Sequence, residues 1–128
     1  MDYVTDTHSL VWYLTEDPRM SNKALSAFAS SENEGRIIVP AVVLAEIMFI
    51  ARKGRVTISF DETLKKIEES ENFLIAPLDL DTLRIADKIE ADLEMHDKLI
   101  AATALSYEAP LITKDENLIL SKVITTVW

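Results

Sequence analysis

Four acidic residues of the chain carry side chains that could perform chemistry together: Asp6, Glu46, Asp97 and Asp115. If their carboxylates converge, mutual repulsion would raise their pKa values or require a metal ion between them. Carboxylate oxygens are ligands that suit Mg²⁺ or Mn²⁺. Such ions activate water and stabilise the oxygens of a phosphoryl group. The hypothesis is therefore an acid-held metal site, provided that the fold brings these positions together.

Glu46 is the most unusual of the four, because it is the only polar residue in the segment AVVLAEIMFIA at positions 41–51. A helix that is apolar on nearly all sides is expected to be buried. An ionised carboxylate is costly to bury without a partner. Glu46 could reach the surface at the helix edge or pair with a buried Arg or Lys, but those residues are rarely buried. The segment favours a Glu that points into a polar cleft and meets cations there.

The other three acids each have a simpler structural explanation when taken alone. Asp6 could cap the helix that it opens, and Asp97 falls in a first helical turn, where the helix dipole stabilises negative charge. Asp115 lies in the polar turn KDEN. Glu94 is interpreted as a solvated residue that could also project toward the same cleft. The joint placement of the acids, at strand ends and at a helix start, is what a common site would explain.

The histidines and tryptophans are weaker candidates. His8 and His96 are the only histidines of the chain, which makes a zinc site improbable. His96 could orient Asp97 or contact a substrate, although a structural role is the simpler interpretation. Trp12 and Trp128 are interpreted as core or dimer surface, since no basic residues interleave with them in the sequence.

Candidate strands and helices alternate along the chain. Strands are expected at residues 2–5, 36–39, 73–76, 111–113 and 123–127. Helices are expected at about 7–14, 21–29, 41–53, 59–70, 79–92 and 95–107, with a turn or short helix at 114–117. This pattern predicts an α/β fold with a parallel twisted sheet of about five short strands and helices on both faces. Sites in such folds form at the carboxyl ends of strands, where Asp6 and Asp115 are expected.

The composition predicts one globular domain over residues 1–128, with 48% hydrophobic and 27% charged residues. The absence of cysteine excludes disulfides and thiolate metal sites. The N-terminus does not have the pattern of a signal peptide, and Pro40 and Glu46 interrupt the longest apolar run, at residues 37–51. A cytoplasmic protein without a membrane partner is therefore expected.

The net charge of −9 argues, taken alone, against a protein that binds nucleic acid. Bound divalent cations would reverse the local sign of charge if some of the acids hold them.

Several segments resemble the PIN-domain nucleases, and in particular the VapC-type toxins of prokaryotic toxin–antitoxin pairs. The segments are TDTHSLVWYL, PAVVLAEI, MHDKLIAATAL and PLITKDENL, followed by VITTVW. The resemblance implies a PIN-like fold and ribonuclease activity that depends on Mg²⁺ or Mn²⁺. The catalytic acids of the family match Asp6, Glu46, Asp97 and Asp115. Of these, we expect Asp6, Asp97 and Asp115 to hold the metal ion.

The resemblance also implies an RNA substrate, a homodimer and a cognate antitoxin that covers the active site. Thr113 matches a hydroxyl residue often found just before the last acid of the family. Lys98 stands where many members have Arg, so that a point charge replaces a bidentate fork. Any contact that depends on that Arg is therefore in doubt. The sequence leaves open whether the protein is a toxin or a stand-alone nuclease.

Three alternatives belong to other classes. Aspartate-nucleophile phosphatases need the motif D-x-D, and His8 occupies its second acidic position. A phospho-acceptor signalling domain also has an acidic Mg²⁺ pocket, and Asp79 or Asp81 could be its phosphorylated residue, but Asp2 is too far upstream to pair with Asp6. A catalytically dead PIN-like interaction module would not need the complete set of acids.

Overall fold

The computed structural model describes the backbone of residues 1–128 and the side chains of residues 1–30 and 34–128. Five parallel strands form one sheet in the order β3-β2-β1-β4-β5. They are β1 Tyr3–Thr5, β2 Ile37–Pro40, β3 Phe73–Ala76, β4 Leu111–Ile112 and β5 Thr126–Val127. The predicted α/β class and the parallel sheet are confirmed. The phospho-acceptor alternative is removed, because that fold has the order 2-1-3-4-5.

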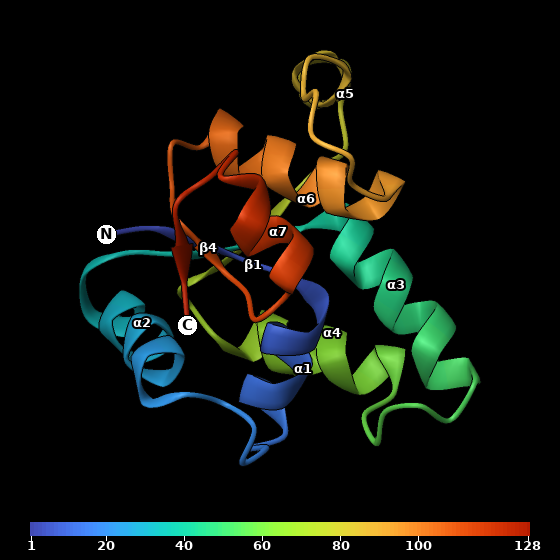
Figure 1. Cartoon of the computed structure of the whole chain (residues 1–128). Helices are drawn as coiled ribbons and strands as arrows, with labels where there is room; N and C mark the ends of the chain where they lie inside the picture. The colour runs from blue at the N-terminus through green and yellow to red at the C-terminus, as the bar shows by residue number, and fades with distance from the viewer.

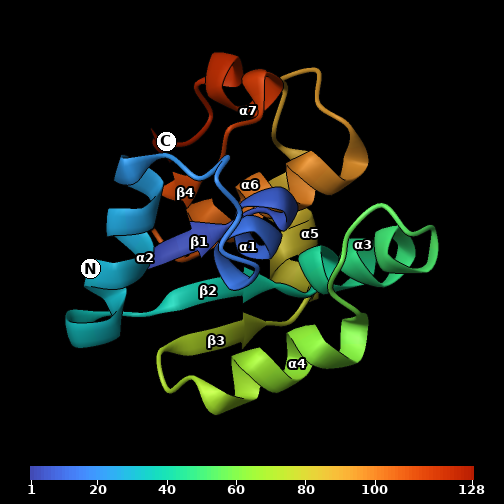
Figure 2. The ribbon, with the colours of Figure 1, turned by 90° about the horizontal axis from the view of Figure 1, so that it is seen from below.

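Helices cover both faces of the sheet, as Figures 1 and 2 show. One layer contains α1, α2 and α4, and the other contains α5 and α6. The helices are α1 Thr7–Leu14, α2 Asn22–Glu34, α3 Ala41–Arg52, α4 Phe60–Glu69, α5 Leu80–Asp87, α6 Met95–Ser106 and α7 Glu116–Ser121. The inner strand β2 is apolar without alternation because both of its faces are covered, and Ile37, Ile38 and Val39 are fully buried.

Local signals in the sequence set most helix starts. Asp6, Ser59, Asp79 and Asp115 are N-caps whose side chains each accept a hydrogen bond from a backbone N–H in the first turn. Pro40 precedes α3 without a side-chain cap. After the end of α3, Gly54 adopts a φ of +68°, which glycine tolerates without strain.

Three expected boundaries are wrong. Helix α2 continues to Glu34 instead of ending at Ala29, and β5 contains only Thr126–Val127. Helix α5 ends at Asp87 rather than near Asp92, yet Ile89 is buried beyond its end. The helical spacing of apolar residues therefore continues past the end of α5. Ile89 lies in the irregular segment that follows and still reaches the core. Tertiary packing overrides the local pattern there.

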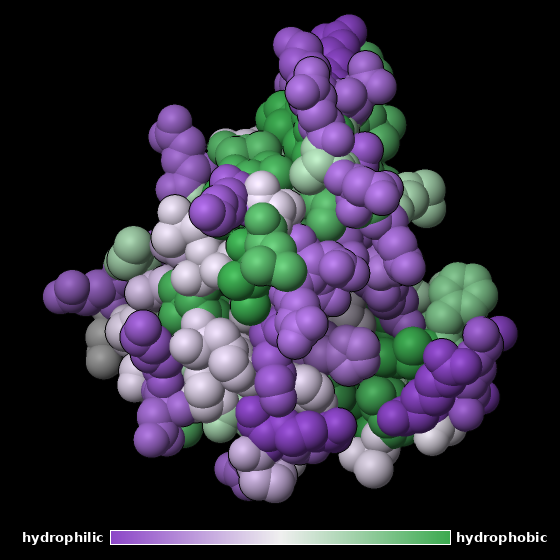
Figure 3. All heavy atoms as spheres, viewed as in Figure 1, coloured by the Kyte–Doolittle hydropathy of each residue, from purple (hydrophilic) through white to green (hydrophobic). Residues whose placement is uncertain are grey.

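Helix α3 is not buried on nearly all sides, contrary to expectation. Only Val43, Leu44 and Ile47 are buried, while Phe49 is 62% exposed. Leu25 of α2 is also exposed. Figure 3 shows hydrophobic areas over α3 and around α5, where exposed apolar residues gather. Among the described residues, no helix has both the length and the apolarity needed to cross a bilayer.

Candidate active site

The four predicted acids line one cleft of about 390 Å³ at the carboxyl ends of β1 and β4. These two strands are neighbours, and the chain passes from β1 to β2 on one side and returns from β3 to β4 on the other. Such a reversal of strand order opens a crevice between adjacent strands, where parallel α/β folds form their sites. Four different parts of the chain, 40 or more residues apart for Asp6, Glu46 and Asp97, therefore meet at one place.

Asp6 is both a helix cap and a wall of the cleft. Its Oδ1 accepts a hydrogen bond from the backbone N–H of Ser9 at 3.0 Å, and its Oδ2 accepts one from the hydroxyl of Thr113. Only 7% of the residue is exposed. Burial raises the pKa of Asp6, and the hydrogen bonds from Ser9 and Thr113 oppose that rise. The capping explanation is correct, but it describes only one of the two carboxylate oxygens.

Thr113 joins the ends of β1 and β4. Its hydroxyl donates to Asp6 and accepts a hydrogen bond from the backbone N–H of Asp115 at 3.0 Å. Asp115 in turn caps α7, with Oδ1 accepting from the N–H of Leu118 at 2.9 Å. The side chain of Thr113 is fully buried. This hydroxyl therefore fixes the two acids that follow neighbouring strands relative to one another.

Glu46 enters the cleft from α3. Its Oε1 accepts a hydrogen bond from the hydroxyl of Thr7 at 2.8 Å, and its Oε2 lies 3.7 Å from Nε2 of His96. The side chain is 27% exposed, and no Lys or Arg of the described residues pairs with it. The structure therefore does not support a Glu paired with a buried base, and it places Glu46 in the wall of the cleft. Thr7 was not recognised from the sequence, because its partner lies 39 positions away.

Asp97 lies at the third position of α6 and forms no hydrogen bond with the described residues. The N-cap of that helix is Glu94, which makes no side-chain capping bond either. Asp97 therefore makes no capping hydrogen bond, although it lies in the first turn of α6, where the helix dipole stabilises its charge. Burial, together with the negative charges of Asp115, Glu46 and Glu94, raises the pKa of Asp97 to about 6, and nearby His96 opposes this rise.

His96 lies among three of the acids rather than in the core. Its Nε2 is 3.5 Å from Oε2 of Glu94, 3.6 Å from Oδ1 of Asp97 and 3.7 Å from Oε2 of Glu46. Glu94 is mostly exposed and leans toward the cleft at its rim. The interpretation of His96 as a plain structural residue does not fit this position, since a protonated ring would compensate part of the acidic charge.

A family model of the PIN domain matches residues 3–123 of the chain. The chain belongs to the PIN domain family. Members of this family are nucleases, which confirms the resemblance found in the sequence. No curated protein matches the chain.

Solved structures share the fold of this PIN domain at low sequence identity. VapBC2 from Rickettsia felis, bound to a promoter DNA fragment, has a TM-score of 0.73 at 16% identity and covers 98% of this chain and 97% of its own. DNA-bound VapBC from Salmonella typhimurium has a TM-score of 0.71 at 16% identity, with coverages of 98% and 96%. A toxin–antitoxin complex from Klebsiella pneumoniae has a TM-score of 0.63 at 19% identity, with coverages of 88% and 86%. These similarities establish the fold.

Two cations also line the acidic cleft of this PIN domain, and nothing in the sequence predicts them there. They are Arg19 and Lys114, and both approach the ring of Trp12. No basic residues lie next to Trp12 along the sequence, but two lie next to its ring in the folded structure, so the expectation drawn from the sequence is wrong. Lys98, at the position where many PIN toxins have Arg, lines a different hollow with Leu83.

The donor set of the cleft fits a hard divalent cation in its chemistry. Its side chains offer carboxylate and hydroxyl oxygens, and the hydroxyl of Ser9 is buried there without a hydrogen-bond partner. Among the described residues, however, no three Asp, Glu or His side chains converge tightly enough to form a ready-made ligand set. Mg²⁺ usually keeps several of its water molecules and binds through one or two carboxylates, so an open arrangement suits it.

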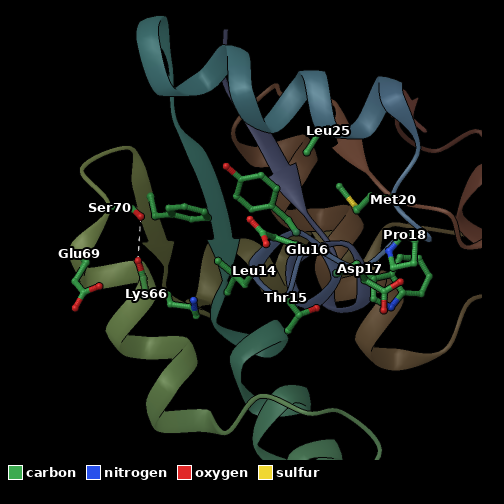
Figure 4. Close-up of a pocket in the computed structure, with 13 residues that line it drawn as sticks. Leu14, Thr15, Glu16, Asp17, Pro18, Met20, Leu25, Lys66, Glu69 and Ser70 are labelled. Atoms are coloured by element: carbon green, nitrogen blue, oxygen red, sulfur yellow. Dashed lines mark hydrogen bonds between the residues drawn. The ribbon is translucent and has the colours of Figure 1, made fainter.

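A larger hollow, of about 980 Å³, lies between the end of α1, α2 and α4 and contains none of the four acids. Figure 4 shows Leu14, Met20 and Leu25 in it beside polar side chains, with Ser70 hydrogen-bonded to the backbone of Lys66. Asp17 of this hollow is paired with Arg19, which lowers the pKa of Asp17 to about 2. Size alone therefore does not mark the chemical site of this PIN domain.

Proposed function

We propose that this PIN domain is a ribonuclease that depends on Mg²⁺ or Mn²⁺ and acts as the toxin of a toxin–antitoxin pair. The observation that carries the proposal is the gathering of four carboxylates from separate elements around one cleft. Burial raises the pKa values of Asp6 and Asp97, and among the described residues no Lys or Arg pairs with either carboxylate. A cleft in which acids outnumber the Lys and Arg that line it favours a cation from solution.

Asp6, Asp97 and Asp115 would hold the metal ion. When bound, the ion would neutralise charge on the phosphoryl group and lower the pKa of water for the attack. Thr113 would keep Asp6 and Asp115 in register, because one hydroxyl bonds to both residues.

Glu46 would act on the water rather than as a metal ligand. Thr7 holds Oε1 of Glu46, which leaves Oε2 directed toward His96 and available to accept a proton. His96 would then stabilise the negative charges of Glu46 and Asp97 by lying between them.

The toxin assignment is supported by the kind of protein whose fold this chain shares. VapBC2 and VapBC are solved as complexes, and the Klebsiella pneumoniae structure is a toxin–antitoxin complex. We infer that an antitoxin covers the acidic cleft of this chain as well. A homodimer is part of the same proposal, and the exposed Phe49 on α3 offers apolar surface for an additional contact. Cytoplasmic RNA would be the substrate.

Cleavage of a labelled single-stranded RNA tests the proposal. The wild-type protein is expected to cut in Mg²⁺ or Mn²⁺ and to stop when EDTA is added. Asp97→Asn is expected to fold normally but to lose cleavage, because Asn lacks the formal charge that a hard cation needs. Circular dichroism provides the folding control. Metal-dependent cleavage retained by Asp97→Asn would show that the active site is misplaced.

Growth of cells tests the toxin assignment separately. Induction of the wild-type gene without an antitoxin is expected to stop growth, and induction of the Asp97→Asn gene is expected to permit it. Cleavage in vitro without any effect on growth would favour a stand-alone nuclease. Folded protein with no metal-dependent cleavage would favour the interaction module.

A further inference from the structure

One wall of the acidic cleft carries positive charge in an otherwise acidic chain. Of the described residues that line the cleft, Arg19 and Lys114 are the only Arg or Lys. The guanidinium carbon of Arg19 lies 4.7 Å from the centroid of the Trp12 ring, and Nζ of Lys114 lies 5.9 Å from it. We propose that these three residues, the Trp12 cluster, bind a phosphate of the RNA chain next to the phosphodiester that is cut. The inference rests on the proposed ribonuclease function and names the contact that positions its substrate.

The overall charge makes such a contact necessary. The chain carries a net charge of −9, and four carboxylates line the cleft itself. An RNA strand entering this cleft brings one negative charge with each nucleotide, and protein cations neutralise phosphates when nucleic acid binds. A metal ion held by the acids would neutralise the phosphate at the point of cleavage, but not the neighbouring phosphates. Cations on the cleft wall are where a neighbouring phosphate can be held.

Lys114 is placed at the mouth of the cleft by its neighbours on both sides. Thr113 before it bonds to Asp6, and Asp115 after it bonds to Thr113, so its backbone is part of the acidic site. Its side chain is exposed, and its ammonium group forms no ion pair with the described residues. A free ammonium group on a fixed backbone, over an aromatic ring, is available for a phosphate.

Arg19 is held more rigidly and has less free charge. Its Nε and Nη2 donate to Oδ1 and Oδ2 of Asp17 at 3.0 and 2.8 Å, while its guanidinium lies over Trp12. These hydrogen bonds leave Nη1 for a ligand, and the side chain is mostly exposed. Because Asp17 neutralises part of the charge, Arg19 is expected to contribute less than Lys114.

Trp12 sets the distance between the two cations and the acids. Helix α1 carries it six residues after Asp6, and its ring packs edge-on against Trp128 with centroids 5.7 Å apart. The ring thus has a fixed place, which both cations approach. A phosphate-binding role also explains why Arg and Lys gather beside a tryptophan in this acidic chain, whereas the Trp128 contact alone does not.

The test measures RNA binding and cleavage in parallel for charge-removing variants. Lys114→Met keeps an apolar stem against Trp12 and removes the charge, and Arg19→Gln removes the guanidinium. Lys23→Met and Arg36→Gln are matched controls: Lys23 is an exposed lysine of α2, and Arg36 forms a bidentate pair with Asp2 far from the cleft. Binding of a fluorescent single-stranded RNA is followed in Ca²⁺ at several salt concentrations, and kcat and KM are measured in Mn²⁺.

Lys114→Met is expected to raise KM about tenfold with little change in kcat, and to reduce the salt slope of binding by about one. Arg19→Gln is expected to show a smaller change in the same direction, and both controls should match the wild type. Unchanged RNA binding and KM in Lys114→Met would overturn the inference even if the protein cleaves RNA. A fall in kcat alone would also overturn it, because Lys114 would then act on the chemistry.

The outcomes separate this inference from the ribonuclease proposal. If the wild type binds RNA through Lys114 but never cuts it, the ribonuclease proposal fails and the phosphate contact stands. If RNA binding is unchanged while binding of a poly-glutamate peptide falls in Lys114→Met, the cluster belongs to an acidic protein partner, and the inference is overturned.

Discussion

The aspartates at the two ends of strand β1, Asp2 and Asp6, lie in opposite electrostatic environments. Asp2, just before the strand, accepts hydrogen bonds from the backbone N–H of Arg36 at 2.8 Å and from Nη2 of its guanidinium at 2.9 Å. The pairing with Arg36 holds the pKa of Asp2 below its usual value. Asp6, just after the strand, is buried among hydroxyl and N–H donors and other acids, and burial raises its pKa.

The difference separates an acid that stabilises the fold from one that is kept for a ligand. At the amino end, Arg36, which directly precedes the neighbouring strand β2, supplies a cation, and the charge of Asp2 is satisfied within the chain. At the carboxyl end, the nearest partners of Asp6 are neutral donors, and the other charges around the cleft include Glu46, Asp97 and Asp115. Negative charge gathered in this way lowers stability until a cation arrives. Substitutions of Asp2 and Asp6, which lie four positions apart, are therefore expected to have opposite results.

The largest expected difference is in activity. Asp6→Asn keeps the N-cap of α1, because Asn caps as well as Asp, but removes a charge from the proposed metal site. We expect kcat/KM for RNA to fall by at least about 100-fold, as for loss of a principal electrostatic contact in a catalytic site. Asp2→Asn should retain nearly full activity. Steady-state cleavage of the same RNA by both variants measures the contrast, and equal losses in the two would remove the distinction between the two ends.

Metal binding should stabilise the folded protein through the cleft that contains Asp6 and should not depend on Asp2. An ion that binds only the folded cleft stabilises it by about 1–3 kcal/mol at concentrations of about 10 to 100 times its Kd. Thermal melts with and without Mn²⁺ should therefore show a rise in the midpoint for the wild type and for Asp2→Asn. Asp6→Asn should show little rise. A wild-type midpoint that does not change at millimolar Mn²⁺ would contradict a shared carboxylate site.

The sequence predicted those parts of the fold that depend on local patterns. Apolar runs, caps and prolines are read over a few residues, and so the parallel sheet and α1 at Thr7–Leu14 were predicted correctly. The places of Asp6 and Asp115 followed, because acids just after parallel strands gather at one edge of the sheet. Asp97 could be placed at a helix start, although not distinguished from a cap.

What the sequence could not predict depends on contacts between distant segments. The apolar composition of α3 does not reveal whether neighbours cover it, and Phe49 is exposed. The bond from Thr7 to Glu46 and the position of Arg19 over Trp12 arise only when separate elements pack. A search by size would also be misled by the larger hollow of Figure 4, since it contains none of the four acids and one of its own acids, Asp17, is already paired with Arg19.

A smaller effect is expected in the pH dependence of the metal-free protein. The pKa of Asp97 is raised to about 6 in the fold, against an ordinary value of 3.8. The folded state therefore holds this proton more tightly, and the free energy of unfolding falls as pH rises through the window between these values. We expect a contribution of about 2 kcal/mol, reduced by solvent screening. Urea unfolding in EDTA from pH 4 to 7.5 measures it. Asp97→Asn should lack this part of the slope, and identical slopes in both proteins would contradict the buried charge.

The smallest effect is expected for the Asp2–Arg36 pair at the amino end of β1, whose contribution to stability should fall as pH falls, opposite to that of Asp97. The pKa of Asp2 is lowered by Arg36, so this pair contributes stability above pH 3.8 that is lost as pH falls through the lowered value. Arg36→Gln should cost at most about 1 kcal/mol at pH 7, because the pair is largely exposed and screened by salt. The cost should shrink toward zero near pH 3 and also in high salt at pH 7. Urea unfolding of this variant and the wild type at both pH values is the measurement. A cost that grows on acidification would mean that Arg36 stabilises the fold by packing rather than through the charge of Asp2, and the contrast between the two ends of β1 would then rest on Asp6 alone.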